Sequence, residues 1–193
     1  MVNKKSPSST LCLEFSNKFS KDEHFDYEKL IIWAKNSGTT NNITADQLLE
    51  YSKSYPFKTD PVIFEAKILA KTINHIYASI AEGKNPLEED VVFLNGSIEK
   101  TFQNLIITPT TSLKFRWGWK EPQIASPEQP LWRIILNAGE TLVETNPKKI
   151  KKCEGLECYK LFIDKSKAGR RKWCSMETCG NRTKTRKYRE RTK

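Results

Sequence analysis

The sequence predicts a mainly α-helical protein: a helical N-terminal domain carries one β-hairpin, and a small cysteine-rich C-terminal module ends in a basic helix. Three observations predict this class. Apolar residues recur at helical intervals through most of residues 26–144, the stretch 113–119 alternates apolar and polar residues, and four of the five cysteines follow residue 152. We therefore expect one ordinary domain and one small module in the 193 residues.

Charge divides the chain at the same place. Residues 148–193 contain 17 basic and 5 acidic side chains, whereas residues 1–147 contain 16 and 18, so the net charges are +12 and −2. We assign residues 1–147 to the helical domain and 148–193 to the module. Positive charge gathered in one segment is typical of a surface that contacts phosphate, in nucleic acid or in anionic lipid. Lipid is the weaker interpretation, because residues 183–193 offer only Tyr188 as an apolar contact.

Two helices are predicted first along the chain. Residues 26–37 (DYEKLIIWAKNS) gather apolar side chains on one helical face, and Gly38 follows as the C-cap. A second, short helix is predicted to begin at Thr44, because Thr44 and Gln47 have the spacing of a capping box ahead of two leucines.

The longest helix is predicted from Asp60 to Gly83. Asp60 can cap it, Pro61 suits the first helical position and Gly83 can end it. Another helix is predicted from Leu87 to about Asn104. Each carries an apolar stripe: Val62, Ala66, Leu69, Ile73, Ile76 and Ile80 in the first, and Leu87, Val91, Leu94, Ile98 and Phe102 in the second.

A hairpin is predicted next. Residues 113–119 (LKFRWGW) alternate with period two, which is typical of a half-buried strand, and residues 105–108 can pair with them across the turn-rich PTTS. We interpret Trp117 and Trp119 as core side chains, with a pocket lining as the alternative.

A loop and a final helix complete the predicted N-terminal domain. Residues 121–130 contain three prolines and are expected to form the loop. The helix is predicted from Leu131 to Glu144, where an Asn-Pro pair at 146–147 ends it. The lysine-rich run 148–152 is the longest linker-like segment.

Four cysteines form two pairs of identical spacing. Cys153 and Cys158 form one pair and Cys174 and Cys179 the other, with four residues inside each pair and 15 between the pairs. Two such pairs can surround one zinc ion, which prefers four tetrahedral ligands. Two disulfides, or iron in place of zinc, are the alternatives. Cys12 lies far from the pairs, and we interpret it as a small buried side chain and not as a fifth ligand.

The module needs a metal ion because its apolar content is small. A core of eight apolar side chains is unlikely to fold residues 153–193 unaided. A structural zinc ion would contribute on the order of 10 kcal/mol. The segment contains no histidine, so we expect one Zn²⁺ with four cysteine ligands and no open position for catalysis.

The cysteine-rich segment, Cys153 to Arg191, resembles the CGNR zinc-finger domain. The shared features are the two cysteine pairs, Arg-Arg-x-Trp-Cys-Ser-Met leading into the second pair, and Cys-Gly-Asn-Arg at 179–182. In addition, LCLEFSN at 11–17 resembles the opening of the ABATE domain, which precedes this finger in bacterial proteins described as stress-induced transcription regulators. The resemblance implies a DNA-binding finger attached to a helical regulatory domain.

Basic residues around the second cysteine pair are the candidate nucleic-acid contacts. A helix from about Thr178 to the C-terminus would carry them on two faces, from which they could reach phosphates or a major groove. One face holds Arg182, Arg186 and Arg189, and the second holds Lys184, Lys187 and Arg191. Arg170, Arg171 and Lys172 form a turn between the pairs and are further candidates.

Residues directly after the last cysteine are expected to support the metal site. Gly180 would permit a close backbone approach or a positive φ, and Asn181 would support the second pair. Arg182 would be shared between sulfur and phosphate, since four thiolates leave the zinc site with a net negative charge.

These patterns predict a double-stranded-DNA-binding transcription regulator and not an enzyme. No nucleophile elbow, phosphate-binding glycine loop or HExxH motif is present, and neither His24 nor His75 is assigned a ligand role. The N-terminal domain would sense a ligand that the sequence does not identify, form a homodimer, or both. RNA binding, a protein-interaction scaffold and a thiol redox sensor are the alternatives.

Membrane contact is not expected. No segment approaches the roughly 18 consecutive apolar residues of a membrane span, and the first lysines are not followed by the apolar region of a signal peptide. We therefore expect a cytoplasmic protein.

Overall fold

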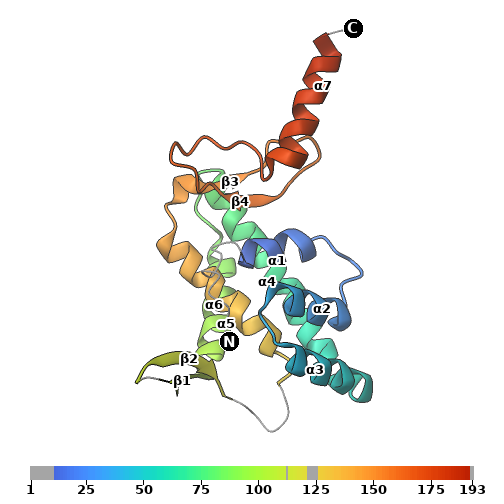
Figure 1. Cartoon of the computed structure of the whole chain (residues 1–193), viewed down its shortest axis with the longest axis vertical. Coiled ribbons are helices and arrows are strands. Elements are labelled where there is room, and N and C mark those ends of the chain that lie inside the picture. Colours follow the sequence, from blue (N-terminus) through green and yellow to red (C-terminus); the bar gives the residue numbers. More distant parts are fainter. Residues whose placement is uncertain (1–10, 112, 121–125, 192–193) are drawn as a thin grey trace.

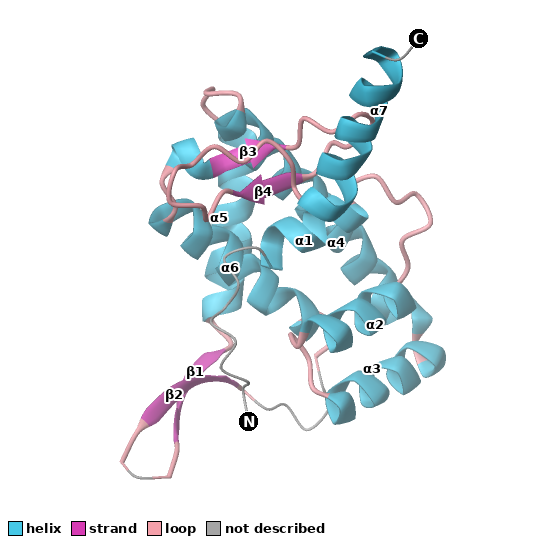
Figure 2. Ribbon diagram, turned by 45° about the horizontal axis from the view of Figure 1, so that its top comes forward, coloured by secondary structure: helices cyan, strands magenta, loops and turns pink. Residues whose placement is uncertain are grey.

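The computed structural model describes residues 11–111, 113–120 and 126–191 and confirms a mainly α-helical fold (Figure 1). Helices form one body, two small antiparallel sheets lie at its opposite ends, and the last helix projects from it (Figure 2). The elements in chain order are α1 (Leu11–Phe19), α2 (Tyr27–Ser37), α3 (Asn42–Ser54), α4 (Pro56–Ala81), α5 (Glu88–Phe102), β1 (Leu105–Pro109), β2 (Phe115–Trp119), α6 (Gln129–Glu144), the 3-10 turn η1 (Pro147–Lys149), β3 (Ile150–Lys152), β4 (Leu161–Ile163), the π-helical turn η2 (Met176–Gly180) and α7 (Asn181–Arg191).

The helices α1, α4 and α6 meet at the centre of the core. Tyr77 of α4 is fully buried, and its hydroxyl donates to the carbonyl oxygen of Ala138 on α6 (2.8 Å). Cys12 of α1 is buried beside it, with its Sγ 3.7 Å from the Tyr77 oxygen. Burial raises the pKa of this thiol to about 11, which keeps it protonated at neutral pH. Cys12 is therefore the small buried side chain that the sequence predicts.

The helix α2 confirms its prediction, whereas α3 begins earlier than expected. Asp26 caps α2 by accepting a hydrogen bond from the N–H of Lys29 (2.8 Å), and Gly38 follows the helix with a left-handed φ of 74°. The cap of α3 is Asn41, whose side chain accepts from the N–H of Thr44 (2.9 Å). The prediction that Thr44 is the cap was wrong, because asparagine is at least as good a cap and stands three residues earlier.

The helix α4 also starts before its predicted first residue. It begins at Pro56, so Asp60 lies inside the helix instead of capping it and Pro61 is internal. Pro56 gives the same start signal as Pro61. As the sixth helical residue, Pro61 cannot donate to the carbonyl of Phe57 and its ring crowds that oxygen. The end is as predicted, with Gly83 just beyond the helix at a φ of 72°.

The buried face of α5 coincides only in part with its predicted apolar stripe, of which Ile98 packs against the core. Leu94 is buried, but Leu87, Val91 and Phe102 are exposed. Its other buried residues are polar or acidic: Asp90, Ser97 and Thr101. Helical periodicity gives the spacing of a face but not the extent of the neighbour that covers it, so only Leu94 and Ile98 of the stripe meet the core.

The hairpin pairs as predicted but is largely uncovered. Leu105 lies opposite Trp119 and Ile107 opposite Trp117 in an antiparallel register. Trp119 packs against Trp132 of α6, with ring centroids 5.2 Å apart. Trp117 is 68% exposed, because the strands project from the helices (Figure 2). The expectation of a half-buried core strand was therefore wrong beyond the base of the hairpin.

The helix α6 follows the predicted loop, of which residues 121–125 lie outside the described residues. It begins at Gln129, two residues before its predicted start, with Pro130 in the first turn. It ends at Glu144, as predicted, ahead of the Asn-Pro pair.

The lysine-rich run is a strand instead of a linker. Its residues Ile150–Lys152 form β3, in which Ile150 pairs with Ile163 of β4. Ile150, Leu161 and Ile163 are buried in the same hydrophobic core as the helices. The cysteine-rich segment is thus packed onto one end of α4 (Figure 1).

The helices of the described residues include none that is both long enough and apolar enough to cross a membrane.

Candidate metal centre and nucleic-acid interface

The four paired cysteines converge on one point. Their Sγ atoms all lie within 4.8 Å of one another, and Cys174 Sγ lies 3.8 Å from that of Cys158 and 3.7 Å from that of Cys179. Four sulfurs bound tetrahedrally to zinc at about 2.3 Å would stand about 3.8 Å apart. A disulfide would need about 2.05 Å. The site therefore fits one structural zinc ion held by Cys153, Cys158, Cys174 and Cys179.

Gly155 organises the first pair and was missed from the sequence. Its carbonyl accepts from the N–H of Cys158 (3.0 Å), and its own N–H points at Cys153 Sγ (3.4 Å), as does the N–H of Cys174 (3.3 Å). A Cβ on Gly155 would lie 2.9 Å from the Cβ of Cys179 and 3.1 Å from its Sγ. No larger residue fits between the two cysteine pairs. The sequence feature that could have predicted this role is a glycine two positions after a ligand cysteine.

The second pair is shaped by the π-helical turn η2. Ser175 caps this turn by accepting from the N–H of Thr178 (3.4 Å), and Cys179 lies within it. Gly180 is buried, and a Cβ there would come within 2.5 Å of the Met176 sulfur. Gly180 is therefore needed for close approach, since its φ is not among the positive values of the described glycines.

The two residues after Gly180 face solvent. Asn181 and Arg182 are exposed, and in the described part of the chain neither side chain donates a hydrogen bond to a cysteine sulfur. The backbone amides of Gly155 and Cys174 both donate to the sulfur of Cys153. Backbone amides thus contact the sulfur of Cys153, whereas Arg182 is exposed at the start of α7.

Burial affects the protonation of the cluster. Desolvation, together with the neighbouring Cys153 thiol, raises the pKa of Cys174 to about 12. Without a metal ion this thiol would keep its proton at neutral pH, and zinc must displace the proton to bind. Coordination then favours the thiolate, because the cation offsets its charge.

A buried carboxylate holds the loop between the two pairs. Asp164 is completely buried and accepts hydrogen bonds from Lys151 Nζ (2.8 Å), the Ser166 hydroxyl (2.6 Å) and the backbone N–H of Arg171 (2.8 Å). The Lys151 ammonium and the Ser166 hydroxyl hold the pKa of this carboxyl well below its usual value. Its contribution to stability is therefore present above the ordinary pKa and is lost as pH falls through the lower folded value.

The predicted basic turn is partly committed to the finger itself. The Arg171 guanidinium lies over the buried Phe162 ring, with Cζ 5.0 Å from the centroid, and donates to two backbone carbonyl oxygens of the second pair. Lys172 forms an exposed ion pair with Glu154 (3.3 Å), whereas Arg170 is exposed. Of the three, Arg171 is the one that the structure gives a clear internal role.

The basic helix α7 starts directly at the metal centre. The Thr183 hydroxyl donates to the carbonyl oxygen of Cys179 (2.8 Å), and the helix then extends away from the body (Figures 1 and 2). Its described basic side chains are all exposed: Arg182, Lys184, Arg186 and Arg189. Arg186 forms an ion pair with Glu190 one turn later (2.8 Å). Lys187 and Arg191 belong to the helix, but their side chains lie outside the described part.

An asparagine of α1 fixes the finger to the helices. The Asn17 side chain donates to the carbonyl oxygen of Leu161 (2.8 Å) and accepts from its N–H (2.8 Å). Nearby, Lys21 Nζ lies 4.2 Å from the ring centroid of Tyr159. Asn17, the final residue of the LCLEFSN stretch, thus forms hydrogen bonds with the backbone of strand β4. The motif alone did not predict this role.

Comparison with known proteins assigns the C-terminal segment. Residues 149–192 match the family described as CGNR zinc finger. No curated protein matches the chain. The matched residues contain all four convergent cysteines and the whole of α7.

Proposed function

We propose that this protein binds double-stranded DNA through α7 and the neighbouring finger surface and regulates transcription in bacteria. In this proposal the helical domain, residues 1–147, senses a ligand, forms a homodimer, or both, and residues 148–193 carry the DNA contacts. The observation that carries the proposal is the position of α7. It is an exposed basic helix whose first turn is anchored to the last zinc ligand.

The dimensions of α7 support a groove contact. Its 11 residues span about 16 Å at 1.5 Å per residue, and a major groove about 12 Å wide admits an α-helix. Zinc would hold only the first turn of this helix rigid, so the rest is free to follow a backbone or enter the groove. Arg182 and Lys184, on different faces, could then reach phosphates on either side.

The zinc ion is proposed to be structural and the protein non-catalytic. Four thiolate ligands complete a tetrahedron and leave zinc no position for water or substrate. The backbone amides directed at Cys153 stabilise negative sulfur and do not point to a reacting group.

The test is selection of bound duplexes from random-sequence DNA by the zinc-loaded full chain. We expect enrichment of a defined sequence, with affinity falling several hundredfold between about 50 and 200 mM salt if about five phosphates are contacted. No enriched duplex would overturn the proposal, and stronger competition by structured RNA than by duplex DNA would assign the surface to RNA.

Paired variants localise the contact. Arg182→Ala/Lys184→Ala should weaken DNA binding and reduce the salt slope by about two, because each residue is expected to contact one phosphate. The control Lys71→Ala/Lys100→Ala removes the same charge from α4 and α5. Equal losses in both double variants, with zinc content unchanged, would show that net charge and not α7 governs binding.

A further inference from the structure

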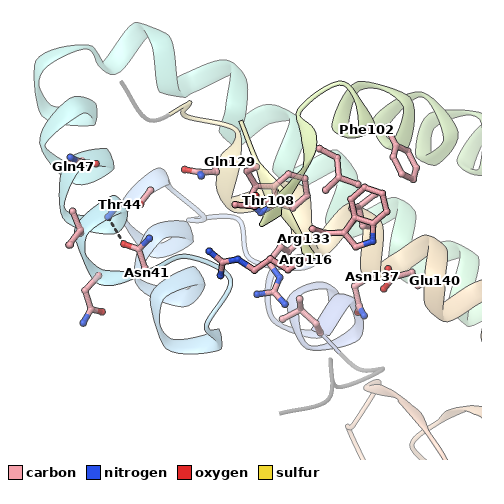
Figure 3. Close-up of a pocket in the computed structure, with 18 residues that line it drawn as sticks. Asn41, Thr44, Gln47, Phe102, Thr108, Arg116, Gln129, Arg133, Asn137 and Glu140 are labelled. Atoms are coloured by element: carbon pink, nitrogen blue, oxygen red, sulfur yellow. Dashed lines mark hydrogen bonds between the residues drawn. The ribbon is translucent and has the colours of Figure 1, made fainter. Parts of the chain in front are cut away.

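A large cleft lies at the opposite end of the molecule from the finger. It has a volume of about 1270 Å³ and is bounded by the hairpin, the start of α3 and one side of α6 (Figure 3). Small-molecule sites in proteins commonly have about 300–1,000 Å³, so a compact organic ligand would fit with room to spare.

Two arginines from different elements enter this cleft. Arg116 comes from β2 and Arg133 from α6, and Figure 3 shows both guanidinium groups directed into the space beside the start of α3. Arg133 donates to the carbonyl oxygen of Gly38 (3.3 Å), which leaves its other N–H groups available. Among the described lining residues Glu140 is the only acidic one. The lining therefore has a net positive charge within a region of the chain whose net charge is negative.

Three aromatic rings also line the cleft. Trp117 and Trp119 of β2 and Phe102 of α5 all line the cleft. Trp117 and Phe102 are 68% and 56% exposed, so they are not filling the core. Large rings left open next to cations provide a surface on which a planar group can stack.

A buried amide completes the wall. Asn137 of α6 is only 6% exposed, and its Oδ1 accepts from the N–H of Cys12 (3.0 Å). The residue also lines the cleft. Its NH₂ group can therefore donate a hydrogen bond to a ligand in the cleft.

We propose that this cleft binds a small organic anion with a planar ring, whose carboxylate or phosphate is held by Arg116 and Arg133 and whose ring stacks on Trp117. Planar guanidinium groups bind both anions through paired N–H donors. The inference deepens the sensing part of the proposed function and is independent of DNA binding.

The experiment measures binding of two anion–neutral pairs by titration calorimetry. Salicylate is compared with salicylamide, and adenosine monophosphate with adenosine. We expect at least one anion to bind about tenfold or more tightly than its neutral partner, since a charge-assisted hydrogen bond contributes about 1.5–3 kcal/mol. Whichever anion is preferred identifies carboxylate or phosphate as the bound group. Equal binding within both pairs, or no binding of either anion, would overturn the proposal.

Two glutamine variants distinguish the loss of a contact in the cleft from the loss of one positive charge elsewhere in the hairpin. Arg116→Gln should weaken the preferred anion about tenfold and leave its neutral partner unchanged, whereas Lys114→Gln, in the same hairpin but not in the cleft lining, should change neither. Equal effects of the two variants would contradict the site. A concentration-dependent dimer that excludes every probe would assign the cleft to a second copy and also overturn it. Failure of DNA selection would leave these results intact, so the two proposals fail separately.

Discussion

Asn17 joins segments that are 144 residues apart in the chain. Its amide satisfies both backbone groups of Leu161, one as donor and one as acceptor. Asp164 works in the same manner, because it accepts from backbone N–H groups of Ser166 and Arg171. The fixed geometry of the finger therefore depends on two side chains that bind backbone, in addition to its four ligands.

Replacing Asn17 tests directly how much its hydrogen bonds to Leu161 stabilise the protein. Asn17→Ala leaves the N–H and C=O of Leu161 without these partners at a partly buried position, so the free energy of unfolding should fall by about 1–3 kcal/mol. Chemical denaturation of the zinc-loaded protein measures this loss, and amide hydrogen exchange at Leu161 should become faster. The control is Asn36→Ala, on the exposed side of α2, which should change stability by no more than about 0.5 kcal/mol. Equal effects of the two variants would show that the Asn17 contacts add nothing.

The metal ligands were predictable from the sequence, whereas Asn17, Gly155 and Asp164 were not. Cysteine chemistry is rare and its spacing is local, so the two pairs identify themselves. A polar side chain such as Asn17 or Asp164 binds backbone groups. Since every residue has such groups, the sequence contains no specific partner residue that would reveal the contact. Gly155 depends on the distance to Cys179, which only the folded chain sets.

At the scale of elements, helices were predicted correctly where apolar spacing and end signals agree. Errors arose because neither signal shows which element covers a given helix or strand face. Besides Leu94, the helix α5 buries Asp90, Ser97 and Thr101, and the strand β2 carries exposed aromatic rings. Periodicity shows that one face is apolar, but it does not show whether a helix, a ligand or solvent meets that face. In β2, Trp117 and Trp119 were interpreted as core side chains, and in the structure they line the cleft.

The first helix links the cleft to the finger. Leu11 lines the cleft, Cys12 is bonded through its N–H to Asn137 in the cleft wall, and Asn17 binds β4. One short helix therefore touches the proposed ligand site at its start and the finger near its end. A ligand that shifted α1 would act on the finger through rigid contacts instead of a flexible linker.

The acidic residue of α7 gives an element-scale prediction. Glu190 pairs with Arg186, neutralises part of the helix and would itself repel phosphate. Glu190→Gln should raise affinity for duplex DNA a few-fold at low salt and steepen the salt dependence by about one. The lost ion pair costs the helix only about 0.3–0.5 kcal/mol. Binding isotherms across a salt series provide the measurement. Glu99→Gln, an equal charge change on exposed α5, is the control, and a gain as large there would refute a specific role for α7.

At the scale of the whole molecule, the finger and the helices share one hydrophobic core. Ile150, Leu161 and Ile163 are buried with residues of α1 and α4. Burial of one such aliphatic side chain contributes about 1.5–3 kcal/mol. The stability of the helical body should therefore depend on whether zinc keeps these strands folded.

Zinc removal should consequently weaken the whole protein and not only the finger. Chelation would release the four thiols, let β3 and β4 detach and expose the three aliphatic side chains, at a cost of several kcal/mol to the helical body. The unfolding midpoint followed by circular dichroism, which reports chiefly on the helices, should fall and should recover when zinc is restored. Cys158→Ser should reproduce the fall without a chelator, because it removes one ligand. An unchanged midpoint after verified zinc loss would mean that the strands stay docked without metal, and that the core alone, with the Asn17 contacts, holds the finger in place.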